Sequence, residues 1–142
     1  MKIGSETITL KTGDRLEFHD ITKMVRECIG RHPVTNGMVL LSALHTTVAL
    51  FINEFQDALL HDMRAILGRL IKERDGYRHD DPRYSDCPRR NADSHMRSVL
   101  LNRNLAFSVV NGDLVLGQFQ SIIFAELDGP RERSLQVQIV GE

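Results

Sequence analysis

The last third of the chain constrains the fold most strongly. Residues 105–110, 114–128 and 134–140 are rich in β-branched and aromatic side chains, and only turn signals separate them. The first separator contains Asn111-Gly112, a dipeptide typical of a two-residue β-hairpin turn. Strands joined by such short turns pair antiparallel, because a parallel pair needs a crossover of a dozen or more residues. This part of the chain therefore predicts an antiparallel sheet.

Strand patterns also occur earlier in the chain. Residues 6–12 and 15–21 alternate apolar and polar side chains around a Gly-Asp turn, which predicts an opening hairpin. Residues 37–45 are apolar at both alternating sets of positions, which predicts a central strand covered on both faces. Residues 48–53 repeat that pattern and predict a further strand.

Three segments have helical periodicity instead. The first, 21–29, follows Asp20 as a natural N-cap and precedes Gly30, which can end a helix in a left-handed conformation. Residues 55–71 carry one apolar stripe, and residues 93–101 form the third helical segment after a long charged loop. With seven or eight strands, these helices predict an α+β fold of β-sandwich-like antiparallel sheets flanked by about three helices.

Composition limits the class of protein. The chain is 42% hydrophobic and 26% charged, which is typical of one soluble globular domain, here residues 1–142. The formal net charge of -1 argues against a nucleic-acid or membrane-surface binder, since these rely on a strongly basic face. We expect a cytoplasmic protein, because the chain has neither a signal-peptide core nor an apolar stretch able to span a bilayer. Cys28 and Cys87 alone give no disulfide framework.

Three histidines are candidates for metal or anion binding. His45 ends the predicted central strand and is followed by Thr46 and Thr47, His79 lies in the charged loop, and His95 lies in the first turn of the third helix. A helix N-terminus disfavours the charged imidazolium, so His95 should be neutral, as a metal ligand must be. Three histidines match the ligand count of a catalytic zinc site. The alternative is that they are ordinary core and surface histidines.

The segment "NADSHMRS", residues 91–98, can be a helix start or a polar ligand cluster. Asn91 or Asp93 would cap the helix, and the cap would position His95 as a ligand. Asp93 is also a candidate catalytic carboxylate.

A second group of candidates lies near the C-terminus. Strand alternation places Glu126 on the same side as Ile122 and Phe124, so its carboxylate must be paired, ligating or neutral unless that face is already polar. Arg131 and Arg133 are spaced by two, so within a strand they would point the same way, as a phosphate clamp or as an ordinary edge-strand charge pair.

Several motifs occur in one order along most of the chain. They are "LHTT" with "INE" six residues on, "YRHDD", "NADSHMRS", "NGDLVLGQFQ" and "ELDGPRER". Together they resemble the YjbQ family, whose members are often labelled secondary thiamine-phosphate synthases. Each motif is modest alone, but the ordered set from about Met38 to the C-terminus is specific.

The resemblance implies a small α+β domain that forms a homotrimer, with its polar site near subunit boundaries. The activity attributed to the family joins a pyrimidine pyrophosphate to a thiazole phosphate and releases pyrophosphate. A metal-dependent hydrolase and a non-catalytic trimeric phosphate- or metabolite-binding module are the alternatives. Together with the chemistry of the residues, the resemblance assigns a divalent metal, zinc or magnesium, to His45, His79 and His95. Phosphate would bind to Thr46, Thr47, Arg131 and Arg133. Glu126 and Asp93 would be the catalytic residues.

Overall fold

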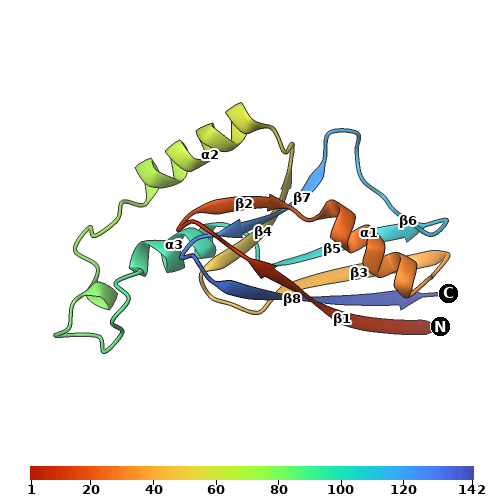
Figure 1. Ribbon diagram of the computed structural model, residues 1–142, viewed down its shortest axis with the longest axis horizontal. Helices are drawn as coiled ribbons and strands as arrows, with labels where there is room; N and C mark the ends of the chain where they lie inside the picture. Colours follow the sequence, from red (N-terminus) through yellow and green to blue (C-terminus); the bar gives the residue numbers. More distant parts are fainter.

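The computed structural model describes all 142 residues and arranges them as two antiparallel sheets and three helices (Figure 1), which confirms the α+β class. One sheet has the strand order β1-β8-β3-β5-β6 and the other β2-β7-β4. The strands are β1 Lys2–Lys11, β2 Glu17–Asp20, β3 Asn36–Ala43, β4 Val48–Asn53, β5 Asn104–Val110, β6 Asp113–Leu114, β7 Ser121–Glu126 and β8 Glu132–Gly141. The helices are α1 Thr22–Arg31, α2 Asp57–Leu70 and α3 Ala92–Leu100, with a short 3-10 turn, η1, at Arg78–Asp80.

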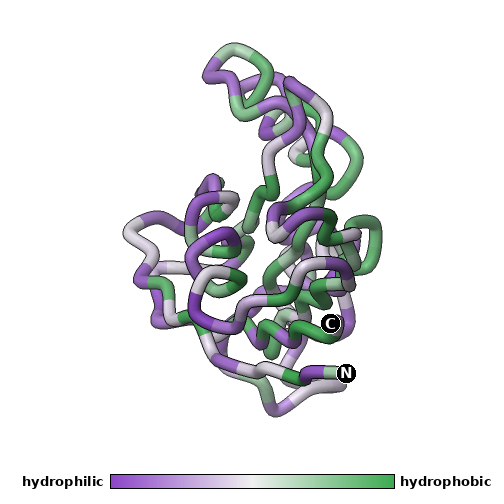
Figure 2. The backbone as a smooth tube through the Cα atoms, turned by 90° about the vertical axis from the view of Figure 1, so that its right-hand side faces the viewer, coloured by the Kyte–Doolittle hydropathy of each residue, from purple (hydrophilic) through white to green (hydrophobic).

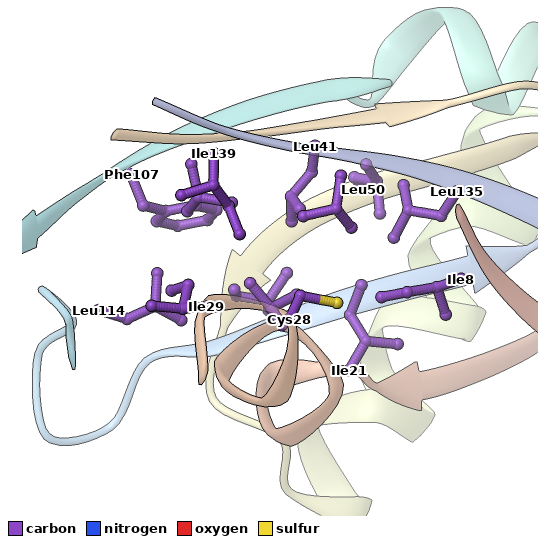
Figure 3. Close-up of a cluster of buried hydrophobic side chains, with 14 of the residues drawn as sticks. Ile8, Ile21, Cys28, Ile29, Leu41, Leu50, Phe107, Leu114, Leu135 and Ile139 are labelled. Carbon is purple, nitrogen blue, oxygen red and sulfur yellow. The ribbon is translucent and has the colours of Figure 1, made fainter. Parts of the chain in front are cut away.

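The main hydrophobic core lies between the two sheets and is closed by α1. Leu41, Leu50 and Ile139 come from the strands, and Ile21 and Cys28 come from the start and middle of the α1 segment (Figure 3). Cys28 is fully buried, as its place on the apolar stripe predicts, and burial is the main cause that raises its pKa to about 12. The thiol is therefore part of the core.

The small sheet is covered on both faces, and β7 is its central strand. Ile122 and Phe124 face the main core, whereas Ile123 and Ala125 face a second apolar cluster against α2. The predicted inward direction of Glu126 is confirmed, because it is fully buried at the end of β7. Its carboxylate therefore needs a partner inside the protein.

The predicted opening hairpin is wrong. β1 pairs with β8 in register from Lys2 and Gly141 to Lys11 and Glu132, while β2 pairs with β7 in the other sheet. The Gly-Asp segment thus carries the chain from one sheet to the other. The ten-residue β1 pairs along its whole length with the ten-residue β8, whereas β2 offers only four residues. This pairing also brings the N- and C-termini side by side (Figures 1 and 2).

The sequence predicted that both faces of β3 are covered, but in the single chain only one face is. β3 is central in the large sheet, with Val39 and Leu41 buried against the core. Met38 and Leu40 on the opposite face are 53% and 37% exposed, because no helix covers that face.

Element boundaries differ from the sequence prediction most clearly at two places. α1 continues through Gly30 to Arg31, since Gly30 does not adopt the left-handed conformation. The strand predicted for 114–128 is split into β6 and β7 by a turn in which the Gln120 amide donates to the Gly117 carbonyl at 3.1 Å. The hairpin turn after β5 is confirmed, with positive φ at Asn111 and Gly112. The helices of this fold are all too short or too polar to cross a membrane.

Candidate functional site

The N-terminus of α3 lies against the end of β7, where most of the candidate residues gather. The Ser94 hydroxyl donates to the Leu127 carbonyl at 2.5 Å, which holds the first turn of α3 against the sheet. The Ala92 amide donates to the Asp80 carboxylate from η1 at 3.0 Å. The prediction that Asn91 or Asp93 caps the helix is wrong, because neither side chain makes a capping hydrogen bond. The charged loop thus supplies the cap and is fixed to the site.

The structure brings His79 and His95 together. Their ring centroids are 4.9 Å apart, and the Nδ1 atom of His79 lies 3.4 Å from Asp80 Oδ1. Both imidazoles are half-buried, so each keeps one side open to solvent. The pair forms the histidine part of the candidate site.

Asp128 forms ion pairs with several arginines. Its carboxylate is only 5% exposed and accepts hydrogen bonds from Arg89 Nε at 2.8 Å and Asn91 Nδ2 at 2.7 Å. An Nη atom of Arg131 lies 3.5 Å away, and Arg15 Nε lies 4.0 Å away. Arg89 and Arg131 are 43% and 32% exposed, so both present free N–H groups to solvent.

The surrounding donors and cations lower the pKa of Asp128. Burial acts to raise the pKa, but hydrogen bonds from Arg89 and Asn91 outweigh burial, and the pKa is lowered overall. Asp128 is therefore an anion at neutral pH that pairs with these cations, and Arg131 lies near enough to His95 to contribute to its lowered pKa.

Glu126 and Arg133, two of the predicted site residues, bind each other inside the protein. Arg133 Nε donates to one carboxylate oxygen at 2.5 Å and an Nη atom donates to the other at 2.6 Å. The same guanidinium donates to the Thr47 hydroxyl at 2.9 Å, and all three side chains are buried. In this arrangement Arg133 and Thr47 are not presented to a phosphate, and Arg131, which precedes β8, does not pair with Arg133 as a clamp.

Asp93 is likewise held by ion pairs. Its oxygens lie 2.8 Å from an Nη atom of Arg15 and 3.2 Å from Arg97, and both Asp93 and Arg97 are buried. Arg97 also donates to the Ile71 carbonyl at 2.8 Å, which ties α3 to the end of α2. In this conformation Asp93 is buried and paired, and it fixes α3 in place.

His45 stands apart from the other two histidines in its bonding. Its Nε2 accepts a hydrogen bond from the Ser134 amide at 2.8 Å, which places the ring proton on Nδ1. Burial is the first cause of its lowered pKa, and the Arg133 cation is the second. Thr46 beside it is exposed, with a hydroxyl open to solvent.

A catalytic zinc site needs three protein ligands close together. No group of three or more His, Cys, Asp or Glu side chains lies close enough to hold a metal ion. His79 and His95 supply two imidazoles, but the lone pair of His45 is already used by the Ser134 amide. One chain therefore does not complete the three protein ligands of a catalytic metal site.

The lowered histidine pKa values predict a loss of stability in mild acid. Burial first, and then His79, lowers the pKa of His95 below 6.5, and the pKa of His45 is lowered too. A histidine whose folded pKa is depressed binds its proton more readily when unfolded, so stability is full above pH 6.5 and falls as the pH drops below it. We expect urea unfolding at pH 5.5 to give a smaller free energy than at pH 7.5.

A His95→Gln variant provides the control for that pH dependence, because glutamine keeps hydrogen-bonding capacity without titrating. In this variant the free energy of unfolding should differ less between pH 7.5 and pH 5.5 than it does in the natural protein. Equal stability of the natural protein at both pH values would contradict the assignment.

Sequence reasoning missed Asp128, Arg89 and Asp80, which organise the site. Asp128 lies two residues after Glu126, so the alternation that placed Glu126 inward also pointed to it. Arg89 and Asp80 lie in the irregular loop, where no periodicity indicates direction.

Comparison with known proteins identifies the family. The family model described as UPF0047 protein YjbQ-like matches residues 6–142. The chain therefore belongs to the YjbQ (UPF0047) family. A UPF0047 protein of Methanothermobacter thermautotrophicus is 37% identical over 142 residues, which cover 100% of this chain and 95% of the relative. A UPF0047 protein of Archaeoglobus fulgidus is 40% identical over 131 residues, 92% of this chain and 97% of the relative.

Solved structures share the fold. A YbjQ-like protein of unknown function from Sulfolobus solfataricus superimposes with a TM-score of 0.91 at 31% identity, covering 99% of both chains. An uncharacterized conserved protein of the YjbQ/UPF0047 family from Clostridium acetobutylicum gives a TM-score of 0.85 at 29% identity, with 95% of this chain and 99% of that chain covered.

Proposed function

We propose that the protein binds a small phosphorylated metabolite between Arg89, Arg131 and His95. The observation that carries the proposal is that Arg89 and Arg131 share the single carboxylate of Asp128 while both remain partly exposed. Two guanidiniums held by one anion leave a net positive charge, and their planar N–H forks suit phosphate oxygens. His95 is close enough to Asp128 and Arg131 for their charges to affect its pKa, and the His79–His95 pair adds ring nitrogens there.

The reaction that fits the proposed site and the family resemblance is a transfer with pyrophosphate as the leaving group. The bond from the pyrimidine methylene carbon to the pyrophosphate oxygen breaks, and a bond from that carbon to the thiazole nitrogen forms. Charge then accumulates on the leaving pyrophosphate, which the arginine cations stabilise. A neutral His95 can donate a hydrogen bond to the same group or exchange a proton with it.

Calorimetric titration with inorganic pyrophosphate tests the binding step. We expect Arg131→Ala to weaken binding at least about tenfold, since a charge-assisted hydrogen bond is lost. Arg103→Ala is the matched control, because Arg103 is exposed and makes no side-chain hydrogen bond or ion pair, and it should bind as the natural protein does. Equal affinity of both variants would contradict the proposed site.

A product assay separates catalysis from binding. With the pyrimidine pyrophosphate and thiazole phosphate as substrates, the transferase should form thiamine phosphate, and His95→Gln should lose turnover. Pyrophosphate binding without product would favour the non-catalytic binding module instead.

The second candidate is a metal-dependent activity, such as hydrolysis of a phosphoester, and the observation in its favour is the close pair of His79 and His95. The proposal needs a third ligand, from His45 after its bond to Ser134 is broken or from a neighbouring chain. Elemental analysis of protein loaded with zinc or magnesium should then find about one metal per chain, and His95→Ala should lose it. Protein that takes up neither metal under any loading condition would rule this version out.

We further propose a homotrimer assembled through the outer face of the large sheet, the face that carries Met38 and Leu40. Met38 pairs with Ser108 and Val140, and Leu40 pairs with Ala106 and Gln138, so the middle of this face contains no charged side chain. Depletion of charge is typical of the core of an interface. The apolar pattern of β3 on both sides would then be explained, because a second copy of the chain would cover the outer side.

A further inference from the structure

A separate hollow of about 390 Å³ lies within the loop that joins α2 to α3. This loop is the green segment that projects to the lower left in Figure 1. The hollow has the volume of a small-molecule site, and five of its eight lining residues are arginines or aspartates, which favours a charged ligand. It contains none of the proposed binding residues Arg89, Arg131 and His95.

Three arginines line this hollow, and two of them have no partner. Arg83 is held by Asp81 through contacts of 3.1 and 2.6 Å. The guanidiniums of Arg74 and Arg90 make no hydrogen bond and no ion pair, although both line the same concave surface. Two cations that line one hollow without a direct ion-pair partner favour an anion there, and the guanidinium fork matches phosphate.

Of the two acidic residues that line the hollow, one is paired with an arginine and the other is largely buried. Asp81 is the partner of Arg83, and the Arg90 cation also helps to lower the pKa of Asp81 after the hydrogen bonds from Arg83. Asp80 is largely buried: its Oδ1 accepts the Ala92 amide at 3.0 Å, and its Oδ2 is buried without a hydrogen-bond partner. The free charge that faces a ligand is therefore that of the two unpartnered arginines.

The backbone at these two arginines supports a binding role. Arg74 has φ of 52° and Arg90 has φ of 50°, both in the left-handed region that favours glycine. Residues kept in such conformations occur preferentially at ligand-binding sites. Arg90 also follows Arg89 directly, and the two arginines belong to different sites: Arg89 binds Asp128 and Arg90 lines the hollow.

We propose that this hollow is a second anion site, in which Arg74 and Arg90 bind the phosphate group of a small metabolite. It does not depend on the site at Arg131 and His95. The two sites would let the protein hold two anionic groups at once.

Titration of nitrogen-15-labelled protein with inorganic phosphate tests the proposal residue by residue. We expect the amide resonances of Gly76 and Tyr77 to shift and saturate by about 20 mM phosphate, a range typical of weak anion binding. A double variant, Arg74→Gly with Arg90→Gly, should weaken this binding at least about tenfold. Its Tm should change by no more than about 3 °C, because glycine adopts the left-handed backbone freely.

Two controls make the result specific. Arg78→Ala removes an arginine of the same loop that stacks on Tyr84 and does not line the hollow, so the shifts should persist. Acetate at equal ionic strength should move these amides less than phosphate does. The proposal is overturned if phosphate shifts only resonances near His95, if acetate acts equally, or if the double variant binds as before.

Discussion

Replacing Arg133 with methionine should lower the free energy of unfolding by about 3–5 kcal/mol, since it leaves the Glu126 carboxylate buried without its partner. The change also removes the donor to Thr47. For a chain of this size the midpoint of thermal unfolding should fall by on the order of 10–20 °C. Circular dichroism melts of the natural protein and the variant measure the difference.

The double variant Glu126→Leu with Arg133→Met is the decisive control. Apolar replacement of a whole buried ion pair is often neutral, so the double variant should recover most of the lost stability. Recovery will be incomplete, because the Asp128 amide donates to Glu126 at 3.1 Å and would lose its acceptor. A single variant as stable as the natural protein would show that the pair is solvated and free to act on a ligand.

This experiment also tests the catalytic role predicted for Glu126 and the phosphate role predicted for Arg133. If both residues are structural, the double variant should keep its affinity for pyrophosphate while the unfolding free energy returns toward its natural value. Loss of binding in a stable double variant would instead support the original assignment.

Local sequence patterns were sufficient for those features that depend on neighbouring residues. Alternation along 122–126 placed Glu126 inward, and Asn111-Gly112 located the hairpin. The position of His95 in the first turn of α3 followed from the start of a helical period. Each of these rests on contacts a few residues apart, where strand and helix geometry is nearly fixed.

Contacts between distant segments could not be predicted in the same way. β1 pairs with β8 across about 130 residues, and a Gly-Asp turn after β1 suggested a local hairpin that was equally compatible with the alternation. The arginines that meet at Asp128 come from β1–β2, the charged loop and the β7–β8 turn. No periodicity specifies such a meeting, because irregular segments are positioned by their tertiary partners.

Replacing Leu40 with glutamate should convert the proposed trimer into single chains of 16.1 kDa. Leu40 lies in the middle of the uncharged sheet face, so a carboxylate there would be buried between copies without a cation. In the isolated chain the same position is 37% exposed, and the substitution should cost little stability. Light scattering coupled to size-exclusion chromatography measures the mass, and circular dichroism checks that the fold is kept.

Ile66→Glu is the matched control, since Ile66 is an exposed apolar residue of α2 far from this sheet face in the fold. It should leave the mass at three times that of the chain. Dissociation by Ile66→Glu with an intact Leu40→Glu assembly would place the interface on the α2 side and refute the proposed one.

Zinc uptake by the Leu40→Glu monomer tests the metal proposal as well. If a neighbouring chain supplies the third ligand beside His79 and His95, the monomer should lose zinc while retaining its fold.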